Sequence, residues 1–155
     1  MARIMIVEDD RHSALIVERM LTRIGGHEVR IVDSPDEVIE RLGRGEVELI
    51  ITDVSLSGST YRGEKVDGLQ LSKIIKSDDK LPHVPIILLT AHAMRGDRER
   101  FLERSQADAY LTKPILDYRS FCDLIQRLLL SAAPLGAASD SSAPEPRTTP
   151  IPDAN

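Results

Sequence analysis

Six consecutive residues, Glu48 to Asp53, constrain the fold of this chain more than any other stretch. The run reads Glu-Leu-Ile-Ile-Thr-Asp, so three large apolar side chains follow one another. A strand with one face in water alternates apolar and polar residues, whereas a parallel strand covered by helices on both faces is apolar throughout. The run therefore predicts a buried parallel strand that ends on a carboxylate, Asp53.

Four further stretches are typical of companion strands, and helical segments separate them. The expected strands are residues 3–7, 28–31, 85–90 and 108–112, of which 28–31 alternates as an edge strand does. Helical spacing is clearest in the last segment, with Phe121, Leu124, Ile125, Leu128 and Leu129. Strands alternating with helices predict an α/β fold, a doubly wound parallel sheet of five strands with five helices.

Local signals indicate where the first two helices begin and end. The first helix should present Ala14, Val17, Leu21 and Ile24 on one apolar stripe and stop at Gly25-Gly26. The second should begin at Ser34-Pro35, with Glu37 closing a capping box on Ser34.

Composition bounds the class of protein. The 155 residues carry a net charge of -5 and no basic helix, which disfavours direct binding to DNA. One cysteine, Cys122, fits a reducing compartment, and with no signal peptide or membrane span in view we expect a cytoplasmic protein. Residues 131–155 are rich in Ala, Ser, Pro and Thr, so we expect a domain over 2–130 and a disordered tail over 131–155.

Chemistry-bearing residues stand at the carboxyl ends of the predicted strands. Glu8 and Asp9 follow the first strand, Asp53 ends the third, Thr90 ends the fourth, and Lys113 follows the fifth. In open α/β sheets these ends meet at one edge, where ligands bind. Carboxylate oxygens around an open position suit Mg²⁺, and an aspartate can itself be the nucleophile of a phosphoryl transfer. The set predicts magnesium-dependent phosphate chemistry at Asp53.

These residues also carry a resemblance to a known family. Val7-Glu8-Asp9, Thr52-Asp53, Thr90-Ala91 and Lys113-Pro114, in this order, resemble the receiver domain of two-component response regulators, over about residues 2 to 130. The resemblance implies a flavodoxin-like sheet with strand order 2-1-3-4-5. It also implies a phosphorylatable switch rather than an enzyme, here a stand-alone one in the manner of the chemotaxis regulators.

The resemblance further implies roles for single residues. Asp53 would accept a phosphoryl group from a sensor histidine kinase or a histidine phosphotransfer protein. Mg²⁺ would be held by Glu8, Asp9, Asp53 and the backbone carbonyl of Ser55, with Asp9 a direct ligand. Lys113 would pair with Asp53 and then with the phosphoryl oxygens, and the Lys113-Pro114 bond stands where the family often has a cis peptide. Thr90 and Tyr110 would switch together, changing a partner-binding face made of the fourth helix, fifth strand and fifth helix.

The connection after Asp53 departs from the family. Ser57 replaces the usual proline, and the stretch before Asp67-Gly68 is longer than usual by roughly a half-dozen residues, beyond a median loop. The insertion over 57–66 is either a solvated loop or a partner-docking feature that uses Tyr61, Arg62, Glu64 and Lys65.

Other interpretations stay open beside the receiver reading. A magnesium-dependent phosphohydrolase would need a second acid two residues after Asp53, where Ser55 stands. A receiver-like interaction module that never takes phosphate would leave the acidic cluster unused. Asp10 we interpret as a charge at a helix N-terminus, and His12 and His92 as solvated residues near the site's rim or as groups that touch the phosphoryl group.

Overall fold

The computed structural model describes residues 1–56, 59–91 and 97–132. Its centre is a five-stranded sheet with order β2-β1-β3-β6-β7, in which every pair of neighbours is parallel. The strands are β1 (Arg3–Val7), β2 (Glu28–Val32), β3 (Leu49–Asp53), β6 (Ile86–Thr90) and β7 (Ala109–Thr112). Counted along the chain these five strands have the order 2-1-3-4-5, so the predicted topology is confirmed, and β2 is an edge strand as expected.

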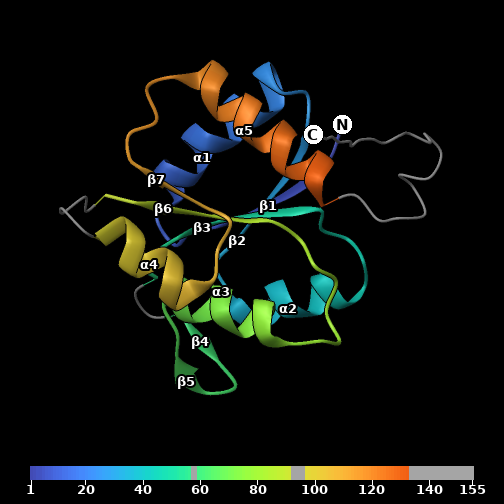
Figure 1. The fold of residues 1–155 in the computed structure, drawn as a ribbon, viewed down its shortest axis with the longest axis vertical. Coiled ribbons are helices and arrows are strands. Elements are labelled where there is room, and N and C mark those ends of the chain that lie inside the picture. The colour runs from blue at the N-terminus through green and yellow to red at the C-terminus, as the bar shows by residue number, and fades with distance from the viewer. Residues whose placement is uncertain (57–58, 92–96, 133–155) are drawn as a thin grey trace, which may run out of the picture.

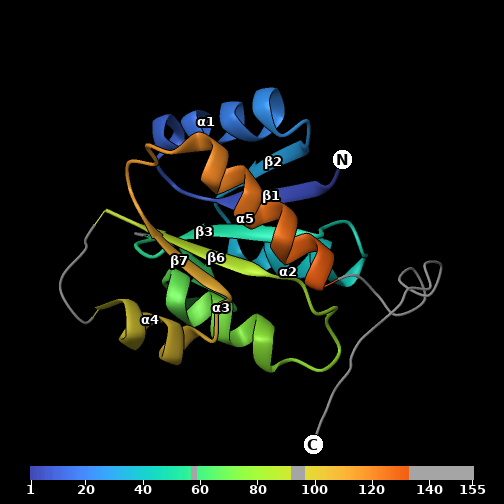
Figure 2. The same ribbon diagram turned by 45° about the horizontal axis from the view of Figure 1, so that its top comes forward.

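Helices cover both faces of this sheet. Figures 1 and 2 show α1 and α5 on one side and α2, α3 and α4 on the other. Their bounds are α1 (Arg11–Arg19), α2 (Pro35–Gly43), α3 (Gly68–Ser77), α4 (Asp97–Ser105) and α5 (Tyr118–Ser131). The predictions for Ser57, His92 and the tail from residue 133 onward concern positions outside the described residues. No helix in the described ranges is long and apolar enough to cross a membrane.

The apolar run of residues 49–51 lies at the middle of the core. Leu49 and Ile51 pack into the apolar cluster under α1 and α5, while Ile50 packs into the cluster under α2 and α3. All three side chains are fully buried. Side chains alternate across a strand, so apolar residues at every position are what a sheet covered on both faces requires.

The first helix departs from its prediction in its last turn. A π-helical segment, η1 (Met20–Ile24), continues α1, and the Gly25 amide donates to the Met20 carbonyl at 3.3 Å. A π turn holds more residues than an α turn, so it rotates the following side chains off the apolar stripe. Leu21 remains fully buried, but Ile24 is 53% exposed, and its predicted place on the buried stripe is wrong.

Capping also differs from the prediction. The Ser34 hydroxyl accepts from the Glu37 amide as expected, but the Glu37 carboxylate accepts from Arg41 Nε at 2.8 Å and does not close the box. A full capping box begins α3 instead. There the Gln70 amide donates to the Asp67 carboxylate at 2.8 Å, and the Asp67 amide donates to the Gln70 side chain at 2.9 Å.

The long polar connection after β3 contains a hairpin. Strands β4 (Thr60–Tyr61) and β5 (Glu64–Lys65) pair antiparallel, and they form a second, two-stranded sheet. Arg62 and Gly63 have φ angles of 54° and 85°, the positive values that a two-residue type I′ turn requires. Each strand is too short to show a period, so the sequence favoured a loop here.

Candidate functional site

Strand register brings the predicted site residues to one edge of the sheet. Val7 of β1 pairs with Thr52 of β3, so Glu8, which follows β1, and Asp53, which ends β3, lie side by side. Thr90 of β6 pairs with Thr112 of β7, which places Lys113 immediately beyond that pair. The carboxyl ends of the central strands therefore converge as expected.

Three carboxylates form the centre of this edge. Glu8, Asp9 and Asp53 each offer an oxygen, and these oxygens lie within 4.8 Å of one another. Glu8 is buried, Asp53 is half-buried and Asp9 is exposed, so the cluster opens to solvent on one side. Hard oxygen donors around an open position are the ligand set that Mg²⁺ takes in proteins, and these residues fit that ion.

Lys113 lies between two of the carboxylates. Its Nζ is 2.6 Å from Glu8 Oε1 and 3.7 Å from Asp53 Oδ1. The Lys113 amide donates to the Thr90 carbonyl at 2.8 Å, and the Lys113–Pro114 peptide bond is cis. The ammonium thus pairs with Asp53 as predicted, but its shorter contact is with Glu8.

The environment of Glu8 disfavours its ionised form. Burial raises the pKa of the Glu8 carboxyl to about 7, and the negative charge of Asp53 adds to that effect, while the hydrogen bond from Lys113 opposes it. A cation at the cluster would act in the same direction as Lys113. A metal ion at the cluster would therefore favour the ionised form of Glu8 that burial disfavours.

The third acid of the Glu8-Asp9-Asp10 run has a different task. The Asp10 carboxylate accepts from the His12 amide at 3.3 Å and from the Ser13 hydroxyl at 2.7 Å, so it caps α1. These bonds, led by the one from Ser13, lower the Asp10 pKa. His12 is an exposed residue of α1. The helix-terminus interpretation of Asp10 is confirmed.

The remaining predicted residues lie around the cluster at different depths. Thr90 is buried at the end of β6, and Ser55 is exposed two residues beyond Asp53. Tyr110 is buried on β7, where its ring lies 5.7 Å from that of Phe101, centroid to centroid. Burial raises the pKa of the Tyr110 phenol. Its ring packs in a small apolar cluster that also contains Val54, the residue after Asp53.

Sequence reasoning missed the part that Gly68 plays. A Cβ added at Gly68 would stand 1.9 Å from the Asp53 carbonyl oxygen, and the Gly68 amide donates to the Val54 carbonyl at 2.8 Å. Helix α3 therefore begins in direct contact with the backbone that carries Asp53. The Asp67-Gly68 pair was visible as a helix start, but its closeness to Asp53 is a tertiary feature.

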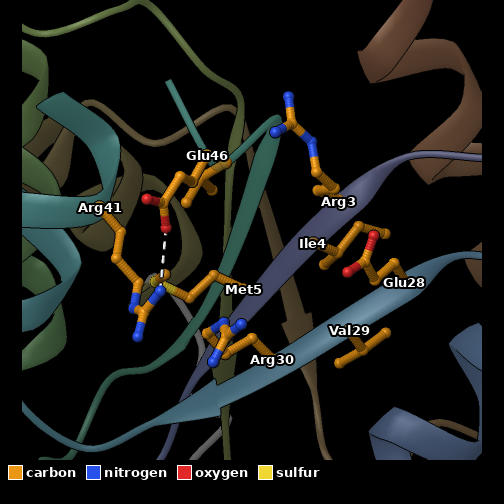
Figure 3. A pocket seen from close by; sticks show the side chains of 9 residues that line it. Arg3, Ile4, Met5, Glu28, Val29, Arg30, Arg41 and Glu46 are labelled. Carbon is orange, nitrogen blue, oxygen red and sulfur yellow. Dashed lines mark hydrogen bonds and ion pairs between the residues drawn. The ribbon is translucent and has the colours of Figure 1, made fainter. Parts of the chain in front are cut away.

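The cavities outside the carboxylate cluster differ in whether they include a residue of the site. The one in Figure 3 lies between β1, β2 and α2, and its Arg41 guanidinium is engaged by Glu46 at 2.9 Å. None of the three carboxylates lines it. The other is an apolar groove between α1 and the start of α5 that includes Lys113, and we call it the α1 groove. It is lined by Ser13, Ile16, Val17, Met20, Lys113, Pro114, Ile115, Leu116 and Tyr118.

Comparison with known families and curated proteins gives concordant matches. Residues 4–126 match the model described as the response regulator receiver domain. The chain is 34% identical over 112 residues to the polar-differentiation response regulator DivK of Brucella anthropi, which covers 72% of this chain and 84% of DivK. It is 33% identical over 133 residues to the response regulator protein FleR of Pseudomonas aeruginosa, across 86% of this chain but only 26% of FleR.

Solved structures share the fold. The receiver domain of a sensor histidine kinase from Pseudomonas aeruginosa, which has a magnesium ion coordinated in its active site cleft, matches with a TM-score of 0.67 and 29% identity, over 83% of this chain and 97% of that one. A CheY-like receiver domain protein from Methanospirillum hungatei matches with a TM-score of 0.66 and 24% identity, over 85% of this chain and 96% of that one.

Proposed function

Because this chain belongs to the response regulator receiver domain family, we propose that Asp53 accepts a phosphoryl group in a magnesium-dependent reaction and that the modification switches a partner-binding surface. The observation that carries the proposal is the convergence of Glu8, Asp9 and Asp53 within 4.8 Å, with the Lys113 ammonium against two of them. The magnesium ion in the cleft of the related kinase receiver supports the metal requirement.

The transfer needs little from the protein beyond position and charge. A carboxylate oxygen of Asp53 attacks the phosphorus of a phosphohistidine, an O–P bond forms as the P–N bond breaks, and the imidazole leaves with the electron pair. Glu8, Asp9, Asp53 and the Ser55 carbonyl would hold Mg²⁺, which supplies positive charge to the phosphoryl oxygens. Lys113, 3.7 Å from Asp53, is placed to neutralise another of those oxygens.

The switch would run through the small cluster beside the acceptor. Thr90 would donate a hydrogen bond to the phosphoryl group, and the Tyr110 side chain would reorient with it. Tyr110 packs in one cluster with Val54, and its ring lies against that of Phe101 of α4, which links the acceptor loop to the face made of α4, β7 and α5. A downstream protein would bind this face in one state of the switch.

The phosphodonor would be a sensor histidine kinase or a histidine phosphotransfer protein, and the α1 groove is its proposed docking surface. Lys113 lines the groove and also contacts Asp53, so a protein seated there reaches the acceptor. Ile16 and Tyr118 are each 46% exposed and Leu116 is 84% exposed. Apolar side chains gathered in one exposed groove are typical of a protein-binding site.

Intact-mass spectrometry after incubation with acetyl phosphate tests the acceptor. We expect one phosphoryl adduct on the wild type in the presence of Mg²⁺, none without it, and none on Asp53→Asn, which keeps the shape of the side chain but removes the nucleophilic charge. Circular dichroism would check that the variant is folded. Equal labelling of wild type and Asp53→Asn would refute the assignment of Asp53. No adduct, together with no Mg²⁺ binding, would favour a phosphate-independent interaction module.

A further inference from the structure

The insertion after Asp53 is anchored at both of its ends by buried side chains and a backbone hydrogen bond. Leu56 and Val66, near its two ends, are buried in the apolar cluster under α2 and α3. The Val66 amide donates to the Ser59 carbonyl at 3.0 Å and closes the base of the hairpin. The hairpin projects on the side of the sheet that α2 and α3 cover, and its strand β4 lies beside α2 (Figure 1). Tyr61 packs against the same cluster. Ordering an insertion of this length costs conformational entropy, and a simple connection between β3 and α3 does not require that order.

The buried hydroxyl of Ser59 links the base of the hairpin to the chain that follows β2, which in turn is bonded to Glu8. Ser59 is 6% exposed, and its hydroxyl donates to the Asp33 carbonyl at 3.3 Å, 26 residues earlier in the chain. Asp33 follows Val32, whose carbonyl accepts from the Glu8 amide at 3.0 Å. A short path of bonds therefore runs from the insertion through the end of β2 to Glu8.

The two halves of the proposed metal site lie on different segments. Glu8 and Asp9 belong to the β1–α1 connection, whereas Asp53 ends β3 and Ser55 follows it in the connection to α3. The β1–β3 pairing ends at Val7 and Thr52, and the β3–β6 pairing continues to Asp53 and Leu89. Ser55 lies beyond both pairings, and the Leu56 carbonyl after it accepts from the Ser59 amide at 3.3 Å.

We infer that the hairpin is a clamp that positions the Ser55 carbonyl against Glu8 and Asp9, with Ser59 and Tyr61 as its positioning residues. Ser59 ties the acceptor loop to the β2–α2 connection, and Tyr61 packs the hairpin against α2. The inference rests on the proposed metal-dependent acceptance of phosphate. It assigns the insertion to the site itself, in place of the solvated loop or the docking feature.

Magnesium affinity tests the clamp with single substitutions. Ser59→Ala removes the hydroxyl and Ser59→Thr keeps it, while Tyr61→Ala removes the ring and Tyr61→Phe keeps it. Lys65→Ala changes an exposed residue of the same hairpin and serves as the matched control. We expect the Kd for Mg²⁺, measured by titration of the intact chain, to rise roughly tenfold in both alanine variants, as for other supports of metal ligands. The conservative variants and the control should match the wild type.

A second readout needs no metal. In Mg²⁺-free protein, hydrogen exchange at the Glu8 amide should accelerate in Ser59→Ala but not in Ser59→Thr, because that amide is bonded at the end of β2. Wild-type affinity in both alanine variants would overturn the clamp while leaving the acceptor assignment intact. A wild type that binds no Mg²⁺ would overturn both proposals. If Lys65→Ala lowers the Mg²⁺ affinity and the Tm as much as Ser59→Ala and Tyr61→Ala do, the effect is a general loss of stability. That result would also contradict the clamp.

Discussion

At the scale of single residues, the site depends on the absence of a side chain at Gly68 as much as on its charged side chains. Gly68 lets the first turn of α3 contact the Asp53 backbone, where a Cβ would meet the carbonyl oxygen at 1.9 Å. A main-chain carbonyl cannot rotate away as a flexible side chain would. The start of α3 or the end of β3 must therefore move if any other residue stands there.

We expect Gly68→Ala to lower the free energy of unfolding by about 1–3 kcal/mol, as overpacking does. Because Asp53 would shift with its backbone, labelling by acetyl phosphate should also slow. Urea denaturation measures the first effect and intact-mass spectrometry the second. Gly43→Ala is the control, since nothing lies within 4 Å of a Cβ there and alanine favours the helix that Gly43 ends. Equal stability of the two variants would contradict the role of Gly68.

At the scale of elements, α1 and the start of α5 form the surface that the proposed phosphodonor would use. Ile16 of α1 lines the α1 groove and is 46% exposed, so a charge there disturbs the groove without entering the core. Leu130 is 73% exposed on α5 and does not line the groove, which makes it the comparable site for a control.

Ile16→Glu should slow phosphotransfer from a histidine phosphotransfer protein roughly tenfold, the loss expected for one well-packed interface residue. Labelling by acetyl phosphate should keep its wild-type rate, because a small donor does not need the groove. Leu130→Glu should behave as the wild type with both donors. The measurement is the rate of phosphoryl transfer with each donor. Equal slowing of both donors by Ile16→Glu would instead indicate damage to the acceptor site.

At the scale of the whole molecule, the shifted pKa values of Glu8 and His27 make stability depend on pH in opposite directions. Glu8 has a raised pKa, so its proton stabilises the folded state and that stabilisation is lost as pH rises toward about 7. His27 has a lowered pKa, chiefly because of burial and then because of the positive N-terminus. Its neutral Nδ1 accepts from the Ala2 amide at 3.1 Å and ties the N-terminus to the start of β2.

For His27 the sign follows from the proton count. The unfolded chain binds the His27 proton at higher pH than the folded chain, so the contribution is full above the ordinary value of 6.5 and falls as pH drops through the folded pKa. We expect wild type to lose stability relative to His27→Gln between about pH 7.5 and 5. Urea unfolding at both pH values measures the difference. A difference that stays constant would contradict the neutral state of His27.

Much of the molecule could be predicted from local patterns, because those patterns have local causes. A few neighbouring residues are enough to predict the buried strand at 49–51, the helix start at Ser34-Pro35 and the last helix. The acids at the strand ends needed only the rule that parallel strands end at one edge. The sequence by itself therefore determined the sheet, its layers and the identities of Glu8, Asp9, Asp53 and Lys113 as neighbours.

Only the tertiary structure decided the features that depend on packing between distant segments. The π turn that exposes Ile24, the contact of Gly68 with Asp53, and the tie from Ser59 to Asp33 have no periodic or motif signal. The shorter contact of Lys113 with Glu8 is set by how β7 and β1 lie across the sheet. Such features follow from where side chains meet after folding, and a linear pattern does not encode those distances.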